Sequence, residues 1–290
     1  QARPLANKSS KVQKFRRYSS LALATTALTE GVTPTAKQLA AVDVTATLQQ
    51  YGDLVTISDV IIDTHEDPVL REASEVLGEQ AAQTVETIRF NVLKAGTNVV
   101  YSNGTARNAV NTEMTLADQR KATRTLKRQN GRAITSVVKS TPSYGTEAVA
   151  PSYVGLIHPD MDAVIRSFAG FVPVEKYGTM TPHEGEIGKV EDVRYVCSTI
   201  FASFANGGGT KGAMIGTSAA DVYPTLIVAR DAYGIVPLKG GASLSPAVVN
   251  PKPSDSDPLA QRGHVSWKSM QTAVILNDAF MVRIESSVTD

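Results

Sequence analysis

The stretch from Asp67 to Gly96 constrains the fold most, because apolar residues recur in it every three or four positions along its whole length. These apolar positions are Val69, Ala73, Val76, Leu77, Ala81, Val85, Ile88 and Val92. Asp67 is suited to cap a helix, Pro68 to occupy its first turn, and Gly96 to end it in a left-handed conformation. The pattern predicts one helix roughly 42 Å long at about 1.5 Å per residue. Such a helix either crosses the whole molecule or extends beyond its compact part.

Charge is balanced over the whole chain but uneven along it. The chain of 290 residues has 29 basic and 28 acidic side chains, so its bulk charge gives no reason to expect a dedicated nucleic-acid binder. The first acid is Glu30, and six cations precede it. A single cysteine, Cys197, excludes an internal disulfide framework and a zinc site built of cysteines. No apolar run approaches the ~18–20 residues of a membrane-spanning helix, so we expect no membrane partner.

The residues before the long helix predict a hairpin with little core of its own. Lys11 to Tyr18 has the composition of an exposed strand, and Val42 to Gln49 alternates apolar and polar residues. Between them lies a long loop rich in threonine and alanine. We therefore expect residues 11–50 to form an extended β-hairpin, preceded by an irregular segment at 1–10.

The residues after the long helix favour a mixed α+β fold with two globular parts. Thr115 to Gln129 predicts a second helix in which Thr115 and Asp118 form a capping box. A polar connector precedes Tyr153, and a proline-rich linker begins at Pro251. One part would be built around the long helix and the C-terminal strands, and the other would be an insertion over 153–250. Segregated helices and antiparallel-looking strands are typical of an α+β fold.

The residues that could carry chemistry each have a simpler structural interpretation. Residues 65–67 (His-Glu-Asp) could hold a metal, but no second histidine follows at helical spacing. His158 could be a general base oriented by Asp160, yet Asp160 also suits the cap of a following helix. Cys197 lies in a predicted strand, where a cysteine is usually a small core residue. None of these residues requires a catalytic role.

The glycine-rich segment from Gly207 to Gly212 matches G-x-G-x-x-G, but no apolar helix follows it. We therefore expect a flexible loop there and no dinucleotide site. No set of residues supplies a nucleophile, a base and an electrophilic group together. The sequence thus predicts no enzyme activity, no cofactor and no metal, and its profile is that of a protein that contacts copies of itself.

The second predicted helix carries a basic stripe. Its cations Arg120, Arg124, Lys127 and Arg128 lie three or four residues apart, with Lys121 beside them. Such a stripe can contact DNA phosphates without reading sequence. It can equally be a solvated face, or it can pair with acids of a neighbouring chain, and the sequence leaves these alternatives open.

Long stretches of the chain, none of them a catalytic motif, follow one another between Lys11 and Glu285. Among them are KFRRYSSLALATTALTEGVTPT, YGDLVTISDVIIDTHEDPVL, GEQAAQTVETIRFNVLKAGTNVVYSNG, VKSTPSYGTEAVAPSYVGLIHPD, RDAYGIVPLKG and TAVILNDAFMVRIE. In this order they resemble the major capsid proteins of tailed bacteriophages, and most closely the phage-N4-type branch of the HK97-like fold.

The resemblance implies a division of the chain into named parts. These are a remnant N-terminal arm at 1–10, an extended loop at 11–50, a peripheral domain at 51–152 with its spine helix at 67–96, an axial domain at 153–250, and a linker with return strands of the peripheral domain at 251–290. It also implies a protein that self-assembles through hexamers and pentamers into an icosahedral shell around the double-stranded DNA genome of a tailed phage.

The expected partners are copies of the chain, packaged DNA held by non-specific contact, and portal and decoration proteins. The expected location is the virion, after assembly in the host cytoplasm. One alternative is an encapsulin-type nanocompartment that encloses a cargo enzyme, and another is a soluble enzyme that uses His158 or His65.

Opposite charges on different parts of the chain suggest where copies meet. The leading 29 residues carry six cations and no acid, so the rest of a chain of net charge +1 carries −5. We expect Lys14, Arg16 and Arg17 to contact Glu79 and Glu86 of a neighbouring subunit. The stripe of Arg120, Arg124, Lys127 and Arg128 is the candidate surface that faces DNA.

Overall fold

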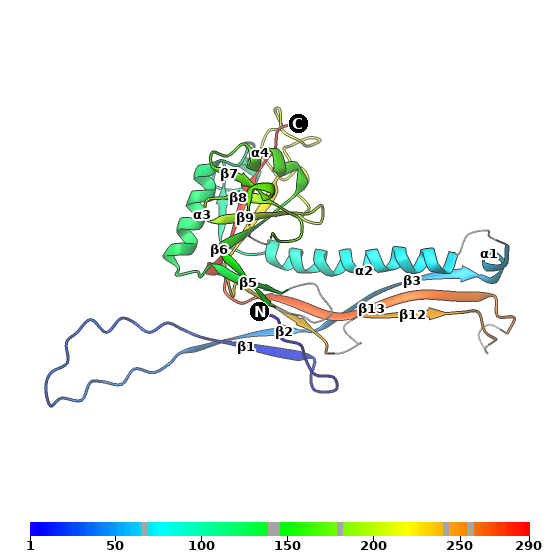
Figure 1. Ribbon diagram of the computed structural model, residues 1–290, viewed down its shortest axis with the longest axis horizontal. Coiled ribbons are helices and arrows are strands. Elements are labelled where there is room, and N and C mark those ends of the chain that lie inside the picture. The colour runs from blue at the N-terminus through cyan, green and yellow to red at the C-terminus, as the bar shows by residue number, and fades with distance from the viewer. Residues whose placement is uncertain (65–68, 139–145, 179–181, 240–243, 254–257) are drawn as a thin grey trace. The chain divides into compact units, whose positions relative to one another are not determined.

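The computed structural model describes residues 1–64, 69–138, 146–178, 182–239, 244–253 and 258–290. The chain forms two compact units, whose helices and strands are labelled in Figure 1. Unit 1 comprises Gln1–Glu66 and Gly234–Leu276, and unit 2 comprises Asp67–Tyr233 and Asn277–Asp290. In the part of the chain that the structure describes, no helix combines the length and the apolar character that crossing a membrane requires.

Unit 1 begins with the predicted hairpin. Strands β1 (Val12–Tyr18) and β2 (Ala41–Thr47) pair antiparallel, with Val12 opposite Thr47 and Tyr18 opposite Ala41. Residues 19–40 connect them as an open loop without regular structure (Figure 1). Composition therefore predicted β1 correctly, and the alternation of apolar and polar residues predicted β2 correctly.

The base of the hairpin closes over a small apolar cluster of Leu5, Phe15, Ala46, Leu48 and Val236. Leu5 reaches this cluster because the N-terminal residues run parallel to β11 (Tyr233–Pro237). The Arg3 amide donates to the Ile235 carbonyl at 3.0 Å, and the Leu5 amide donates to the Pro237 carbonyl at 2.9 Å. Residues 1–10 form no helix or strand, as predicted, but hydrogen bonds to a strand far along the chain hold their first half in place.

The other strands of unit 1 form a second sheet. Its central strand is β13 (Arg262–Ile275), which pairs antiparallel with β3 (Gln49–Ser58) and with β12 (Leu244–Val249). Alternate side chains of β13 are buried, Val265 and Trp267 among them, as expected for a strand with one packed face. A short helix, α1 (Asp59–Thr64), follows β3 directly.

Helix α2 (Val69–Lys94) of unit 2 confirms the predicted long helix over 26 residues. The proposed cap, Asp67, and Pro68 lie outside the described residues. Leu77 and Ala81 are buried as predicted, but Val76 is exposed because the next residue along a helix is rotated by about 100°. Phe90 and Leu93 are also buried although they lie on the opposite side of the helix, so its last turns are enclosed from two sides.

Gly96 follows α2 but is not a left-handed cap, because its φ is not positive. A Cβ atom at this position would lie 2.7 Å from Met281 Cε and 2.9 Å from Asp278 Oδ1. The predicted cap was therefore wrong, and close packing against residues near the C-terminus explains the glycine instead.

The core of unit 2 is an eight-stranded sheet in the order β4-β14-β10-β6-β9-β8-β7, with β5 paired to β6. The β14–β4 and β6–β9 pairs are parallel, and the other pairs are antiparallel. The strands are β4 (Val99–Tyr101), β5 (Ile134–Val138), β6 (Thr146–Ile157), β7 (Phe171–Pro173), β8 (Glu186–Val190), β9 (Val193–Cys197), β10 (Tyr223–Val228) and β14 (Met281–Ser286). Helices α3 (Leu116–Arg128) and α4 (Asp162–Arg166) contribute buried side chains to the same core.

The boundaries of the two compact units differ from the domain boundaries that the sequence suggested. Residues 234–250 belong to unit 1, whereas 99–152 and 277–290 belong to unit 2 together with 153–233. The cause is long-range strand pairing: β14, near the C-terminus, lies between β4 and β10. The assignment of peripheral and axial domains stays a prediction from the resemblance.

Candidate assembly surfaces

The hairpin carries the three cations that were predicted to contact a neighbour, but they are not equivalent. Arg16 lies directly opposite Asp43, and its guanidinium makes two hydrogen bonds to that carboxylate, Nε to Oδ1 at 2.8 Å and Nη2 to Oδ2 at 2.9 Å. These bonds hold the pKa of Asp43 below its ordinary value and raise the pKa of Arg16. The structure thus gives Arg16 a partner within its own hairpin.

Lys14 and Arg17 make no ion pair in the part of the chain that the structure describes. Side chains alternate across a strand, so Lys14 shares a face with Arg16, whereas Arg17 shares the opposite face with Phe15. Phe15 is buried in the apolar cluster at the base of the hairpin. The two unpaired cations therefore lie on different faces, which spacing along the sequence alone did not predict.

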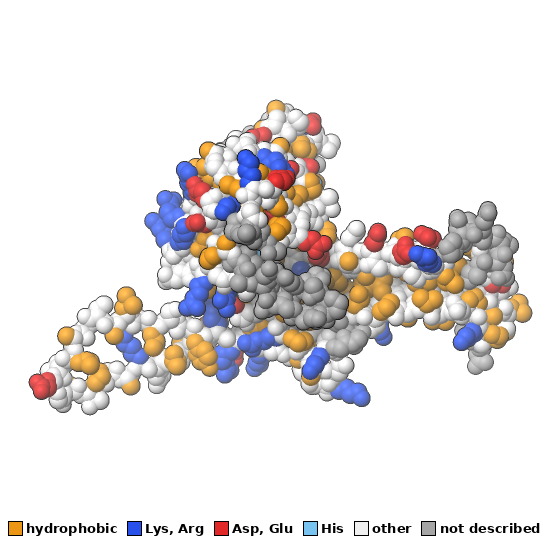
Figure 2. Space-filling model, in the orientation of Figure 1, with side chains coloured by type: hydrophobic (Ala, Val, Ile, Leu, Met, Phe, Trp, Pro, Cys, Tyr) orange, Lys and Arg blue, Asp and Glu red, His pale blue; other side chains and the backbone are white. Residues whose placement is uncertain are grey.

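The hairpin and its loop also expose large apolar side chains. Figure 2 shows hydrophobic residues on this loop. They are Val12, Tyr18, Leu21, Leu23, Leu28, Val32, Leu39 and Val42, and Leu23 is 86% exposed. Exposed apolar side chains gathered on one loop are typical of a surface that contacts a partner.

The acids of helix α2 lie on its exposed side. Glu79 and Glu86 are both exposed and form no ion pair among the described residues, whereas Glu75 pairs with Arg71 one turn earlier at 3.3 Å. Exposed pairs of this kind contribute little to stability. Glu79 is thus available to meet a cation of another chain, whereas Glu86 also interacts electrostatically with Arg89 of its own helix.

Helix α3 is set on the sheet of unit 2 by its cap and by one buried amide. Thr115 and Asp118 form the predicted capping box, in which the Asp118 carboxylate accepts from the Thr115 amide at 3.1 Å and the Thr115 hydroxyl accepts from the Asp118 amide at 3.3 Å. Gln119 is fully buried, donates to the Val190 carbonyl at 2.9 Å and accepts from the Tyr195 hydroxyl at 2.8 Å. These bonds fix which cations of α3 face the β8–β9 turn.

The basic stripe of α3 is divided into two flanks. Arg120 pairs with Glu191 at 2.9 Å, and Lys127 pairs with Asp192. Both acids occupy the two-residue turn between β8 and β9, where Glu191 has a φ of 52°. Hydrogen bonds to these carboxylates raise the pKa of Arg120 and of Lys127. This paired flank is neutralised within the chain.

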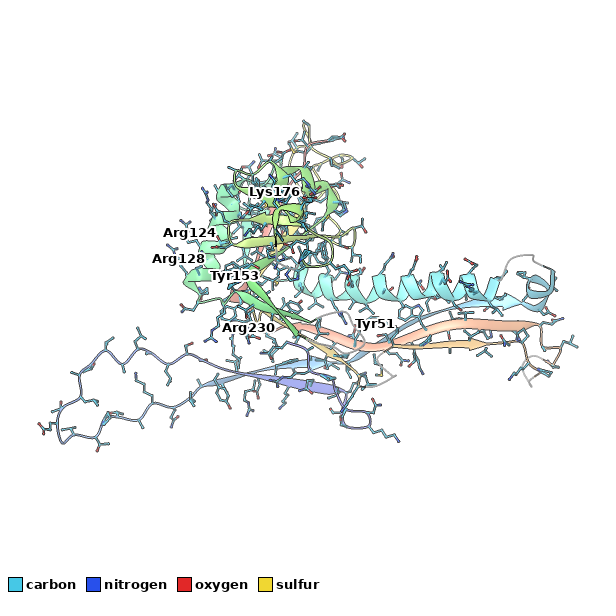
Figure 3. The ribbon with its side chains drawn as sticks, in the orientation of Figure 1. Tyr51, Arg124, Arg128, Tyr153, Lys176 and Arg230 are labelled. Atoms are coloured by element: carbon cyan, nitrogen blue, oxygen red, sulfur yellow. The ribbon has the colours of Figure 1, made fainter. Side chains whose placement is uncertain are left out.

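The other flank consists of Lys121, Arg124 and Arg128, at positions i, i+3 and i+7 of α3. All three are exposed, and no ion pair joins them to the described residues. Figure 3 shows Arg124 and Arg128 pointing away from the sheet of unit 2. We call these three residues the free flank of α3, because it holds the charge that the stripe can offer to an anion.

A buried charge cluster, which sequence reasoning missed, ties the end of α2 to the sheet. Glu285 in β14 is fully buried and accepts from Arg107 at 2.8 Å and from Arg283 at 2.7 Å. Arg283 also donates to the carbonyls of Gly96, at 2.8 Å, and of Lys94. Burial, reinforced by the neighbouring charges of Arg107 and Arg283, lowers the pKa of Lys94. The signal in the sequence was the Arg283-x-Glu285 spacing, which puts both charges on one face of a predicted strand.

The residues considered for catalysis have structural roles or lie outside the described residues. His158, and not Asp160 as predicted, caps the following helical turn, because its Nδ1 accepts from the Asp160 amide at 3.3 Å. Asp160 instead accepts from the Tyr223 hydroxyl at 2.6 Å. Burial raises the pKa of Cys197, which keeps its thiol protonated. The segment at 65–67 is not described, and the described residues gather no three metal-binding side chains.

The glycine-rich loop is held by hydrogen bonds, contrary to the prediction of a flexible loop. The Asn206 side-chain carbonyl accepts from the amides of Thr217, Ser218 and Ala219 at 2.9–3.2 Å. A Cβ atom at Gly208 would lie 2.3 Å from the Val110 carbonyl oxygen. The glycines therefore allow segments of the backbone to pack closely. A glycine-rich motif in the sequence is compatible both with such packing and with a mobile loop.

The chain matches a family model described as phage capsid protein over residues 41–230. No curated protein matches the chain.

Solved structures match over nearly the whole chain. The capsid of Ralstonia phage GP4 is 12% identical with a TM-score of 0.71, and the match covers 100% of this chain and 87% of that one. The head of Helicobacter pylori bacteriophage KHP40 is 11% identical with a TM-score of 0.66, covering 99% and 87%. The SrpI encapsulin of Synechococcus elongatus is 12% identical with a TM-score of 0.60, covering 100% and 86%.

These structures share with the chain a mixed α+β architecture, and the fold is HK97-like. The family model alone spans well over half of the 290 residues. The chain therefore belongs to the phage capsid protein family.

Proposed function

We propose that this capsid protein assembles through hexamers and pentamers into a closed icosahedral shell that encloses the double-stranded DNA of a tailed phage. Its place in the phage-N4-type branch, its purely structural, non-enzymatic role, its partnership with portal and decoration proteins, and its assembly in the host cytoplasm belong to the same proposal. The observation that carries it is the hairpin of unit 1, whose loop exposes a series of large apolar side chains. A subunit with such a loop is incomplete until a neighbour covers it.

In this proposal the hairpin lies over the next subunit of a ring. The contact is heterologous, because a hairpin meets a different surface of its neighbour, and such contacts close into rings when the rotation fits. Lys14 and Arg17 supply the unpaired charge, since Arg16 is satisfied by Asp43. Glu79 and Glu86 of the neighbouring α2 are the proposed acceptors.

DNA would be held by confinement and by weak phosphate contacts. The free flank of α3 supports this part of the proposal, because no ion pair joins its three cations to an acid among the described residues, while the other flank is neutralised. The formal net charge of +1 argues against a protein that binds DNA tightly as a free subunit. The packaged genome is therefore proposed as a partner of modest affinity.

A nanocompartment is the second candidate function, and the match to the SrpI encapsulin favours it. That structure has nearly the same coverage as the phage capsids, with a TM-score of 0.60. The fold of a shell protein does not by itself show whether the shell encloses a genome or a cargo enzyme.

Electron microscopy of the expressed protein, followed by analysis of particle content, tests both candidates. Closed shells are the expected result, and particles from infected cells should contain nuclease-protected double-stranded DNA and one portal vertex. A co-purifying enzyme without DNA would support the nanocompartment. A species of about 31 kDa with no larger assembly would contradict both shells, since 30.8 kDa is the mass of one chain.

A further inference from the structure

Three asparagines of the chain directly precede a glycine, and they are Asn103, Asn130 and Asn206. An Asn-Gly pair offers the least steric resistance to spontaneous deamidation, because glycine has no Cβ atom to shield its amide nitrogen. The three pairs have the same chemistry as far as the sequence is concerned. The structure makes them unequal, since the reaction needs a glycine amide that is free to attack and a side chain that can turn toward it.

The reaction begins when the glycine amide nitrogen attacks Cγ of the asparagine. A bond forms between this nitrogen and Cγ, the bond from Cγ to Nδ2 breaks, and the amide proton leaves with Nδ2 as ammonia. Water then opens the succinimide ring at either of its carbonyl carbons, which yields aspartate or isoaspartate. Hydrogen bonds that hold the attacking amide or the asparagine side chain must break first, so they slow the reaction.

Asn206 is protected at both reacting groups. Its side-chain carbonyl accepts from three backbone amides of residues 217–219 at 2.9–3.2 Å, which fixes the side chain. The Gly207 amide, which would have to attack, donates to the Phe204 carbonyl at 3.1 Å. Deamidation at Asn206 would therefore require the glycine-rich loop to open.

Asn130 is protected by the end of helix α3. It follows the helix in a left-handed conformation, with a φ of 56°. The Gly131 amide donates to the Leu126 carbonyl at 2.9 Å, and the Asn130 amide donates to the Lys127 carbonyl at 3.0 Å. The amide that would attack thus closes the last turn of the helix. Deamidation at Asn130 would require this turn to unwind.

Asn103 lacks this protection. Asn103 and Gly104 lie between β4 and the helical turn η1 (Arg107–Ala109), and both residues are exposed. Within the described ranges the Gly104 amide donates no hydrogen bond. The Asn103 side chain makes a single bond there, from Nδ2 to Asn111 Oδ1 at 2.8 Å, which leaves its carbonyl group unengaged. One exposed bond between two side chains is a small barrier compared with the opening of a helix end or a loop.

We propose that Asn103 is a site of spontaneous deamidation in the folded subunit, whereas the fold protects Asn130 and Asn206. Each event replaces a neutral amide with a carboxylate, so it lowers the formal net charge of the chain from +1 to 0. The co-reactant is water alone. The site is therefore independent of assembly and of the proposed function.

The isoaspartate product also lengthens the backbone of an anchored turn. On one side the Ser102 amide donates to the Glu285 carbonyl at 3.0 Å, and on the other side Arg107 pairs with the Glu285 carboxylate at 2.8 Å. Isoaspartate inserts a methylene group into the main chain between these anchors. Residues 103–106 must absorb the added length, because both anchors belong to the buried charge cluster.

Peptide mapping of the ageing subunit tests the site. The folded, unassembled chain is incubated at mildly alkaline pH, and each Asn-Gly peptide is followed for the gain of about 1 Da that deamidation produces. Asn103 should react first, with rates at Asn130 and Asn206 lower by about tenfold or more, the effect of hydrogen bonds that must break. The rate at Asn103 should rise with pH, because the attacking amide must lose its proton.

The unfolded chain and one variant are the matched controls. In concentrated urea all three asparagines should react at similar rates, because the hydrogen bonds that protect two of them are lost. Asn103→Gln should abolish the early mass gain of the folded subunit, since glutamine would have to close a larger and less favourable ring.

Two outcomes would overturn the inference. One is an unmodified Asn103 in folded subunits under conditions in which the urea-unfolded chain reacts there. The other is a set of equal rates at the three asparagines in the folded subunit, which would show that the fold does not select among them. A chain that forms no shells would contradict the proposed function and leave both of these measurements possible.

Discussion

Arg16 and Asp43 face each other across the hairpin, with two hydrogen bonds of 2.8 and 2.9 Å between guanidinium and carboxylate. The pair removes one of three expected cations from the surface that a neighbouring subunit would meet. It also joins β1 to β2 at a point where both strands are largely exposed.

The Arg16–Asp43 pair should titrate as a unit in the unassembled subunit. Hydrogen bonds from Arg16 lower the pKa of Asp43, so the pair contributes fully above the ordinary carboxyl pKa of about 3.9 and is lost as pH falls through the lowered value. In Arg16→Gln the pKa of Asp43 should rise toward its ordinary value, as measured by NMR titration of the carboxyl carbon. The same pKa in wild type and variant would disprove the pairing in solution.

Charge reversal on the hairpin should depend on which cation is changed. Lys14→Glu with Arg17→Glu should prevent assembly, because two acids would meet Glu79 and Glu86 of the neighbour. The matched change is Arg16→Gln, which removes a cation already satisfied by Asp43 and should leave assembly near wild type. The measurement is the yield of shells by sedimentation at low and high salt, and equal yields from both variants would contradict the assignment.

The two flanks of α3 should differ in their effect on DNA binding. Changing Lys121, Arg124 and Arg128 to Gln should reduce the slope of log K against log salt by about 2.7 for a short duplex, since each phosphate contact contributes about 0.9. Changing Arg120 and Lys127 to Gln should leave the slope nearly unchanged, because Glu191 and Asp192 already neutralise them. Equal slopes for the two variants would show that the free flank does not contact phosphates.

Glu285→Gln should be strongly destabilising. The change leaves the guanidinium groups of Arg107 and Arg283 without their buried carboxylate, a loss that typically costs about 3–5 kcal/mol. Glu86→Gln is the matched control, because Glu86 is exposed and should change the free energy of unfolding by less than about 0.5 kcal/mol. Denaturant unfolding of the unassembled subunit measures both, and similar values would contradict the role of the cluster.

Two glycines associated with α2 should respond in opposite directions to alanine. Gly78→Ala should stabilise the subunit by about 1 kcal/mol, because nothing outside the local helix backbone and the adjacent residues lies within 4 Å of the new methyl group and alanine favours the helix. Gly96→Ala should destabilise it by about 1–3 kcal/mol, because the methyl group would overlap Met281 and Asp278. Thermal melting of both variants checks the signs, and stabilisation by Gly96→Ala would contradict the close packing of Gly96 against Met281 and Asp278.

The sequence by itself determined the elements whose cause is local. The periodicity of apolar residues predicted α2, composition predicted β1, alternation predicted β2, and the spacing of Thr115 and Asp118 predicted the capping box. Each of these signals arises between residues a few positions apart. Family resemblance added the capsid fold, which the comparisons confirm.

Only the tertiary structure decided which charges are free and which glycines are packed. Arg16 and Asp43 are 27 residues apart, Arg120 and Glu191 are 71 apart, and Arg107 and Glu285 are 178 apart. Strand register and sheet order bring these residues together, and neither can be read from a short window of sequence. The long helix was therefore predictable as a helix, whereas the contact of Phe90 with Phe201 and the charge cluster around Glu285 depend on residues far along the chain.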